Sequence, residues 1–216
     1  LTFNETSGNK PTSNGMKIGF VGQGWIGKHY ADDFEARGYD IVRYSLAPEH
    51  LPNRNAIAEC DIVFIAVPTP TTPGGHNVNS IRDVLPLVGK GKIAVIKSTI
   101  FPGTTVELDH EFPGVFVLHS PEFLRETNAA YDASHPDRNI IGIPQRTEEY
   151  MEKAKQVLAV LQYAPYQTVM DAMDAEFVKY AGNCFLYTKV VYMNMLYELV
   201  QSMGGDWDRI KDAFTN

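Results

Sequence analysis

The chain has 216 residues, of which 44% are hydrophobic, and a formal net charge of −7. This length allows one large domain, or one domain with an appendage, and is sufficient for a buried core. The excess of acidic residues argues against a nucleic-acid-binding surface. No apolar run is long enough to cross a membrane and no signal peptide is evident, so we expect neither nucleic acid nor membrane as partner and a cytoplasmic location.

Residues 1–15 are rich in Asn, Ser, Thr and Gly. Their apolar content is too low to form a core. We therefore expect residues 1–15 to be a flexible arm or a remnant of expression, with Met16 as the natural start.

The glycine turn, residues 22–27, follows a short apolar strand and contains Gly22, Gly24 and Gly27. This spacing is typical of the turn that places a dinucleotide's pyrophosphate at a helix N-terminus. The strand before it, the helix pattern after it and a second strand near Ile41 are the context that the motif requires. The sequence thus predicts a Rossmann-type α/β fold with a doubly wound, mostly parallel sheet. The predicted cofactor-binding residues of the turn are Gly22, Gln23, Gly24, Trp25, Ile26 and Gly27.

The second predicted strand, residues 39–44, leads into Ser45 and contains no carboxylate at its end. In dinucleotide-binding folds an acidic residue about twenty positions after the glycines usually binds the ribose hydroxyls. Ser45 with Arg43 nearby could instead accept a 2′-phosphate, or Arg43 could simply be solvated at the strand end. We expect NAD as cofactor, with Ser45 in its site and NADP left open.

The polar link at 46–59 is too short for a full crossover helix, so we expect an open adenine side. The third strand, residues 61–67, is apolar throughout, as in strands covered on both faces. Its carboxyl end carries Val67, Pro68 and Thr69. Ligands of parallel sheets bind at such ends, which favours cofactor contact over a purely structural turn.

The rest of the first 171 residues continues the alternation of strands and helices. In chain order we expect a helix at 78–88, a strand at 92–96, a polar loop at 97–105, strands at 115–118 and 139–143, a helix from Thr147 to Leu161 and a strand at 166–170. The strand ends direct Thr69, Thr99, Glu122 and Glu126 to one rim. Hydroxyls and carboxylates there suit proton transfer or water positioning, unless the two glutamates are ordinary surface acids.

The longest predicted helix runs from Asp174 to about Met203. Apolar residues cover most of its girth, which predicts burial on more than one side at a domain or subunit seam. Lys179 and Asn183 are four apart and share a face; Lys179 is either an edge residue or a functional cation. A short second helix at 206–214 follows Gly204 and Gly205. We expect residues 172–216 to begin a helical domain, with a homodimer through residues 174–203.

Two cysteines and six histidines are scattered through the chain. Cys60 lies at a strand entrance and Cys184 inside a helix, which predicts two reduced packing residues. The histidines lack the spacing of metal ligands. The sequence predicts no metal site.

From Met16 onward the chain resembles the UDP-glucose/GDP-mannose dehydrogenase family, in its N-terminal domain and the first part of its central helix. The resemblance rests on Gly22-Gln-Gly-Trp-Ile-Gly27, Val67-Pro-Thr-Pro70, Ser98-Thr-Ile-Phe-Pro-Gly103, Ser120-Pro-Glu-Phe-Leu-Arg-Glu126, Pro136-Asp-Arg138, and Glu176 with Lys179 and Asn183. It implies oxidation of the C6 alcohol of a nucleotide sugar to a carboxylate, in two steps with two NAD⁺, as in polysaccharide biosynthesis.

The resemblance also implies roles for single residues. Thr99 and Glu126 would activate the water that hydrolyses a thioester, contacting the cofactor too, while Lys179 and Asn183 would stabilise oxyanions. The implied substrate-binding residues are Glu122, Phe123, Leu124, Arg125, Lys179 and Asn183. The family's nucleophile is the cysteine of a Gly-Gly-x-Cys-x-x-Lys-Asp motif beyond the long helix, and these 216 residues do not contain that motif. As printed, the chain would not form the thioester.

Two other functions stay open. One is a catalytically inactive NAD(P)-binding module. The other is a β-hydroxyacid dehydrogenase relative, because that group also uses a lysine and an asparagine four apart on a long helix and needs no cysteine.

Overall fold

The computed structural model describes residues 15–73, 75–125 and 127–215. The predicted arm therefore lies, except for Gly15, outside the described residues. Contacts divide the chain into two units, Leu1–Lys179 and Tyr180–Asn216. Each unit is described by itself.

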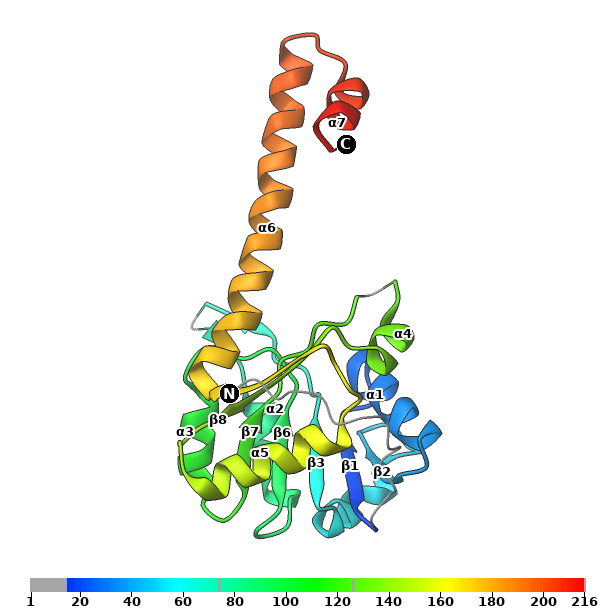
Figure 1. Cartoon of the computed structure of the whole chain (residues 1–216), viewed down its shortest axis with the longest axis vertical. Coiled ribbons are helices and arrows are strands. Elements are labelled where there is room, and N and C mark those ends of the chain that lie inside the picture. Colours follow the sequence, from blue (N-terminus) through cyan, green and yellow to red (C-terminus); the bar gives the residue numbers. More distant parts are fainter. Residues whose placement is uncertain (1–14, 74, 126, 216) are drawn as a thin grey trace. The chain divides into compact units, whose positions relative to one another are not determined.

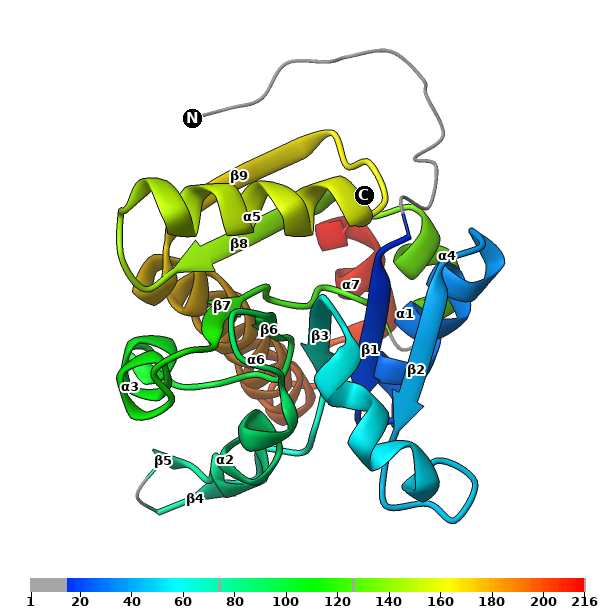
Figure 2. The same cartoon turned by 90° about the horizontal axis from the view of Figure 1, so that it is seen from below.

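The first unit is built on a seven-stranded sheet with the order β2-β1-β3-β6-β7-β8-β9 (Figures 1 and 2). Its strands are β1 Lys17–Val21, β2 Asp40–Tyr44, β3 Ile62–Ile65, β6 Ile93–Ile96, β7 Phe116–His119, β8 Arg138–Ile143 and β9 Tyr166–Asp171. The pairs among β2, β1, β3, β6 and β7 are all parallel. This confirms the predicted Rossmann-type, mostly parallel sheet.

Helices connect these strands. They are α1 Trp25–Ala36, α2 Asn79–Val84, α3 Thr104–Glu111, α4 Ala129–Ser134 and α5 Glu148–Val160, with 3-10 helices η1 Leu51–Glu59 and η2 Leu85–Leu87 and a small hairpin of β4 Thr71–Thr72 and β5 Gly75–His76. The link at 46–59 holds only the 3-10 helix η1, in agreement with its expected shortness. The short helices α3 and α4 were not predicted.

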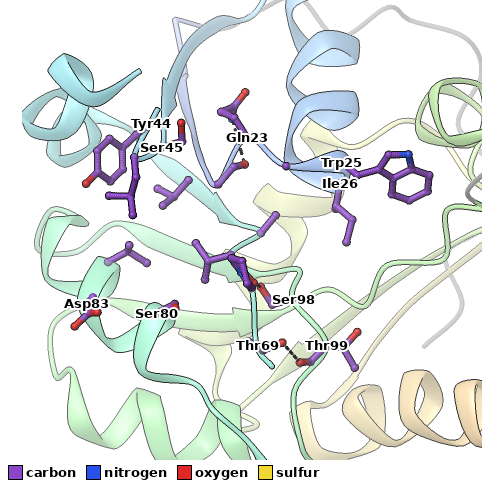
Figure 3. A pocket seen from close by; sticks show the side chains of 18 of the residues that line it. Gln23, Trp25, Ile26, Tyr44, Ser45, Thr69, Ser80, Asp83, Ser98 and Thr99 are labelled. Atoms are coloured by element: carbon purple, nitrogen blue, oxygen red, sulfur yellow. Dashed lines mark hydrogen bonds between the residues drawn. The ribbon is translucent and has the colours of Figure 1, made fainter. Parts of the chain in front are cut away.

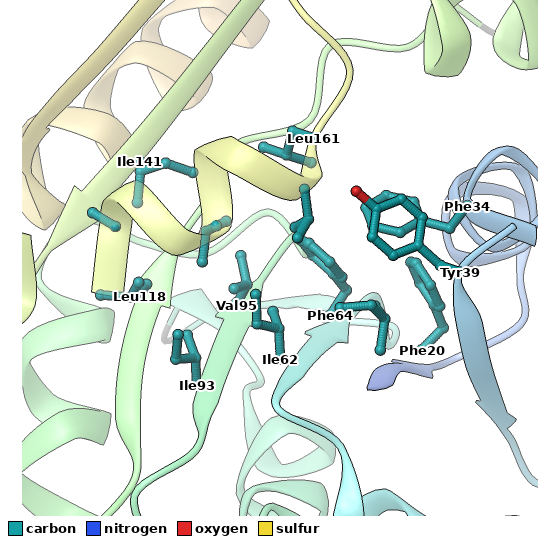
Figure 4. Close-up of a cluster of buried hydrophobic side chains, with 14 of the residues drawn as sticks. Phe20, Phe34, Tyr39, Ile62, Phe64, Ile93, Val95, Leu118, Ile141 and Leu161 are labelled. Atoms are coloured by element: carbon teal, nitrogen blue, oxygen red, sulfur yellow. The ribbon is translucent and has the colours of Figure 1, made fainter. Parts of the chain in front are cut away.

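The core lies on both faces of the sheet because successive strand residues point to opposite sides. On one face Phe20, Phe64 and Phe34 of α1 pack with ring centroids 5.2 to 5.5 Å apart (Figure 4). On the other face Val63 and its neighbours pack against η1, α2 and α3. Burial on both faces explains why the central strands are continuously apolar.

Strand β8 runs antiparallel to β7, and the two are joined only through the pair His119 and Gly142. The connection through α4 does not cross back over the sheet, as a parallel connection would require. A Cβ on Gly142 would lie 2.8 Å from Ala175 Cβ. The glycine therefore lets the first turn of the long helix at Ala172–Ser202 approach β8 closely.

The long helix α6, Ala172–Ser202, begins in the first unit and continues into the second, and α7, Trp207–Thr215, follows it. Gly204, with a φ of 74°, ends α6 as expected. Within the second unit Tyr197 packs edge-on against Trp207, with ring centroids 5.4 Å apart. Among the described residues, no helix has the length and apolar character of a membrane span.

The apolar face of α6 is open in the single chain. Phe185 is 64% exposed, Tyr187 72% and Met195 64%. The apolar pattern of the long helix predicts burial on more than one side. The described residues of this chain do not bury these side chains.

Candidate functional site

The glycine turn joins β1 to α1, and each of its glycines meets different surroundings. Gly22 has a φ of 89°, and its backbone N–H donates to Tyr44 O at 2.9 Å. A Cβ added to Gly22 would lie 2.4 Å from Ala66 O, and a Cβ added to Gly27 would lie 1.8 Å from Gly22 O. A Cβ added to Gly24 would meet nothing within 4 Å. The protein's own backbone thus requires Gly22 and Gly27, while Gly24 leaves open space.

The N-terminus of α1 faces that open space. Gly24 is its N-cap, no side chain caps it, and its first turn holds no acid. Free backbone N–H groups and the positive end of the helix dipole together suit a phosphate. The residues present therefore fit a dinucleotide pyrophosphate.

The glycine-turn cavity, of about 740 Å³, lies beside this helix end and reaches along the ends of β1, β2, β3 and β6 (Figure 3). Ten residues predicted to bind the cofactor line it: Gly22, Gln23, Gly24, Trp25, Ile26, Ser45, Val67, Pro68, Thr69 and Thr99. Gly27 is buried in helix–strand packing instead, and Glu126 lies outside the described residues. The structure thus gathers the predicted set into one cavity, and their binding roles stay predictions.

Other lining residues were missed from the sequence. They are Val21, Tyr44, Leu46, Arg54, Ala66, Ser80, Asp83, Val84 and Ser98. Arg54 comes from η1, and Ser80 and Asp83 come from α2. Spacing along the chain does not reveal that these helices return to the cavity, whereas Ser98 follows a strand and was open to the same strand-end argument as Thr99.

Hydroxyl groups tie two strand-end loops together at the cavity. Thr69 Oγ1 donates to Thr99 O at 2.7 Å, and Ser98 Oγ donates to Val67 O at 2.6 Å. The loops after β3 and β6 therefore form one rim, which the strand-end argument predicts.

Arg43 forms ion pairs with two carboxylates of α1. Its guanidinium lies 2.8 Å from Asp32 Oδ1 and 2.8 Å from Glu35 Oε2, and its side chain is 17% exposed. The interpretation of Arg43 as a merely solvated strand-end residue is wrong, because two carboxylates hold it. The same pairing removes it as a free cation for a 2′-phosphate.

Glu122, which follows β7, and Lys179, on α6, form an ion pair. Glu122 is 5% exposed, so its interpretation as a surface acid is wrong. Lys179 Nζ lies 3.6 Å from Glu122 Oε2 and 5.8 Å from the centroid of the Phe123 ring. Lys179 therefore turns its charge toward the protein rather than toward water, which rules out the edge-residue alternative.

Two buried ionisable residues beside this pair were not singled out from the sequence. Lys97 Nζ donates to Ser120 Oγ at 3.2 Å and lies 4.3 Å above the Tyr30 ring. Burial lowers the pKa of Lys97 to about 8. Burial, aided by the Lys97 charge, lowers the pKa of His119 to about 3, and a contact with the Ile96 backbone opposes that shift.

Glu176 anchors the start of α6. Its carboxylate accepts hydrogen bonds from the backbone N–H of Gly103 at 2.5 Å, the backbone N–H of Thr105 at 2.8 Å and the Thr105 hydroxyl at 2.5 Å. Burial raises the pKa of Glu176, and these donors oppose that shift. A carboxylate at the N-terminus of α3 is also favoured by the helix dipole. The contact fixes the turn that carries Lys179.

The predicted sugar-binding residues Phe123, Leu124 and Arg125 line a second, smaller cavity of about 200 Å³. Its other lining residues are Tyr30, Asp132, His135, Pro136, Asp137 and Arg138. Arg125 is held by two side-chain bonds to Asp132, at 3.0 and 2.7 Å. Glu122 and Lys179 are not among the residues lining this cavity.

Asn183 and the two cysteines are not among the residues that make the contacts described above. Asn183 is exposed on α6 and belongs to the second unit. Both cysteines are free; Cys60 is buried, as predicted, and burial raises the pKa of its thiol to about 11. Cys184 is exposed, so its interpretation as a packing residue is wrong.

Comparisons with known proteins agree with this geometry. The NAD binding domain of the UDP-glucose/GDP-mannose dehydrogenase family matches residues 43–162, and the central domain of that family matches residues 173–216. UDP-glucose 6-dehydrogenase YwqF of Bacillus subtilis (strain 168) is 30% identical over 239 residues, covering 90% of this chain and 53% of that protein. UDP-glucose 6-dehydrogenase of Rhizobium meliloti (strain 1021) is 31% identical over 238 residues, covering 88% and 54%.

A solved structure, a UDP-glucose dehydrogenase from Pyrobaculum islandicum, matches with a TM-score of 0.80 and 28% identity, covering 94% of this chain and 57% of that one. The chain thus spans about half the length of the curated relatives it matches. Because the NAD-binding family model covers more than half of the chain, and the fold and glycine turn agree with it, the chain belongs to the UDP-glucose/GDP-mannose dehydrogenase family and carries that family's NAD-binding domain.

Proposed function

We propose that this chain is the cofactor-binding part of an NAD-dependent nucleotide-sugar 6-dehydrogenase, which oxidises the C6 alcohol of a UDP- or GDP-sugar to the uronate. One observation carries the proposal. The loop at 97–99 links two parts of the site. Thr99 lines the glycine-turn cavity, and the buried Lys97 donates to Ser120 Oγ, in the segment that also carries Glu122, the ion-pair partner of Lys179. A cofactor in the cavity would thus lie next to a preorganised cation.

The residue roles follow from the charge changes of the reaction. Bound NAD supplies the hydride acceptor. Loss of the hydroxyl proton gives the substrate oxygen negative character, which a positioned cation stabilises. We assign this role to Lys179, with Asn183 one helical turn away as a second donor. Thr99 and Glu126 would position the water of the later hydrolysis; the assignment of Glu126 and Asn183 rests on the family motif.

The organisation of the chain is part of the proposal. Residues 16–171 form the NAD(P)-binding domain, and residues 172–216 begin a central helical domain that pairs two chains through residues 174–203, in the cytoplasm. The exposed apolar side chains of α6 support this pairing, because apolar patches on that scale mark protein interfaces. Light scattering should give twice the monomer mass, and Phe185→Glu should lower it toward the monomer. An unchanged monomer mass in the starting protein contradicts the homodimer.

Cofactor binding is tested by titrating the chain with NADH and recording nicotinamide fluorescence. We expect saturable binding, abolished by Gly24→Val because the new side chain fills the space open to the phosphates. Unchanged affinity in Gly24→Val contradicts the site.

Turnover is tested in the protein encoded by the whole reading frame, with UDP-glucose and GDP-mannose as substrates. We expect NADH formation, lost in Lys179→Ala while the cofactor still binds. NADH binding without turnover on any nucleotide sugar favours the inactive module. Activity only on small hydroxy acids favours the β-hydroxyacid dehydrogenase relative.

A further inference from the structure

The residues at the end of β2 line one end of the glycine-turn cavity, and their side chains indicate which nucleotide, NAD or NADP, this end would bind. Tyr44 and Ser45 lie at this end, on the far side from Thr69 and Thr99 (Figure 3). Arg54, from η1, lines the same cavity. In dinucleotide-binding folds the residues at the end of the second strand bind the adenosine ribose. The end with Tyr44 and Ser45 would therefore hold the adenosine of a bound dinucleotide, and the end with Thr69 and Thr99 would hold the nicotinamide.

Helix η1 packs against β2, with Ile57 in the same buried cluster as Val42 and Tyr44, and one hydrogen bond fixes its first turn. The Asn53 side-chain amide donates to Arg43 O at 2.9 Å. This bond ties the first turn of η1 to the last residues of β2. Arg54, the next residue, is thereby held beside the loop that carries Ser45.

Arg54 is the one cation among the described lining residues, and it is exposed. It makes no ion pair or side-chain hydrogen bond within the ranges that the structure describes. By contrast, Arg43 is neutralised by Asp32 and Glu35. A nearby guanidinium is thus available at the adenosine end, although it is not the one that the sequence suggests.

The usual carboxylate is missing from the same place. An acid after β2 binds the two ribose hydroxyls of NAD and repels a 2′-phosphate, and here that position is Ser45. The Ser45 Oγ accepts a hydrogen bond from Ala47 N at 3.3 Å, which leaves the hydroxyl proton free to donate. Asp83 is the one carboxylate among the described lining residues and comes from α2, on the same wall as Ser80 (Figure 3).

We infer that Arg54 and Ser45 bind the 2′-phosphate of NADP, so that this chain binds NADP(H) at least as tightly as NAD(H). The inference rests on the proposed cofactor site and adds its selectivity. A guanidinium presents paired N–H donors that match phosphate oxygens, and a serine hydroxyl adds one more donor. Without a carboxylate after β2, nothing at that position repels the added charge.

The test is a fluorescence titration of the chain with NADPH and with NADH, at low and high salt. We expect NADPH to bind at least as tightly as NADH, with an advantage that shrinks as salt screens the phosphate contact. Arg54→Ala should weaken NADPH roughly tenfold or more, since hydrogen bonds to charged groups are of that size, and should leave NADH within about twofold. Ser45→Asp should reverse the preference. Competition by 2′,5′-ADP should exceed that by 5′-ADP and should be lost in Arg54→Ala.

Arg209→Ala is the matched control, because Arg209 is an exposed arginine of the second unit and does not line the cavity. Tighter binding of NADH than NADPH, with a further gain for NADPH in Asp83→Asn, would show that Asp83 replaces the missing acid and would overturn the inference. Equal weakening of both nucleotides by Arg54→Ala would also overturn it, by showing that Arg54 contacts the adenine. If neither nucleotide binds, the proposed cofactor site is itself wrong and the inference falls with it.

Discussion

The ammonium of Lys179 lies 3.6 Å from a carboxylate oxygen of Glu122, with side chains that are 17% and 6% exposed. The two residues are far apart in the sequence and meet because Glu176 fixes the first turns of α6 against α3. A largely buried ion pair of this kind holds the lysine in one place before any ligand arrives.

We expect a strong energetic coupling between Lys179 and Glu122. A double-mutant cycle with Lys179→Met and Glu122→Gln should give about 1–3 kcal/mol in chemical unfolding, because each single change leaves a buried charge without its partner. The exposed pair of Lys28 and Asp32, with side chains 59% and 41% exposed, is the control. It should couple by less than about 0.5 kcal/mol. Equal coupling energies in the two cycles would refute the structural role of the Lys179–Glu122 ion pair.

Gly27 and Gly24 of the turn should respond differently to alanine. Gly27→Ala places a Cβ 1.8 Å from Gly22 O and should cost about 3 kcal/mol or more of unfolding free energy, because backbone must move. Gly24→Ala meets nothing within 4 Å and has a φ of −71°, so its thermal midpoint should stay near that of the starting protein while NADH binding weakens. A large loss of stability in Gly24→Ala would contradict this division.

His119 should make the fold sensitive to acid. Its pKa is lowered by burial to about 3, below the usual 6.5. Between these values the unfolded chain takes up a proton that the folded chain does not, so stability falls as the pH drops from 6.5 toward 3, by up to about 1.4 kcal/mol per pH unit. Unfolding curves of His119→Leu over this range should show a smaller slope with pH than the starting protein. An identical slope would mean that folding does not shift the pKa of His119 and would contradict this prediction. The variant His110→Leu, at an exposed histidine, is the control.

Glu176→Gln should destabilise the start of α6. An amide presents an NH₂ group to at least one of the three donors that now face a carboxylate, which should cost about 1–3 kcal/mol. Hydrogen exchange of the backbone amides at the beginning of α6 should become faster. Asp174→Asn, which changes an exposed acid in the same turn, loses only its interaction with the helix dipole and should cost less than about 1 kcal/mol.

The sequence predicts the central strands well, because a strand that is covered on both faces of the sheet consists of a continuous run of apolar residues. It also predicts α5, where the Thr147 side chain accepts a hydrogen bond from Tyr150 N at 3.3 Å, as a helix cap should. It does not reveal α3, whose polar sequence Thr-Thr-Val-Glu-Leu-Asp-His-Glu shows no strong apolar period. The direction of β8 is likewise hidden, because residue patterns carry no information on which way a strand runs.

The candidate site is predictable where ligands meet strand ends and unpredictable where charges are buried. Thr69 and Thr99 follow from the strand-end rule alone. Lys97 and His119 do not, because burial of such residues depends on neighbours contributed by other strands and helices. The pairing of Arg43 with Asp32 and Glu35 is likewise visible only in the three-dimensional structure.

Folding demands glycine at positions 22 and 27, and at position 24 the protein's own atoms leave room for a larger residue. A descendant that no longer needed a nucleotide would thus be free to replace Gly24 and still keep the same architecture. Position 24 is therefore a place where a bound pyrophosphate, and not the packing of the fold, would select for glycine.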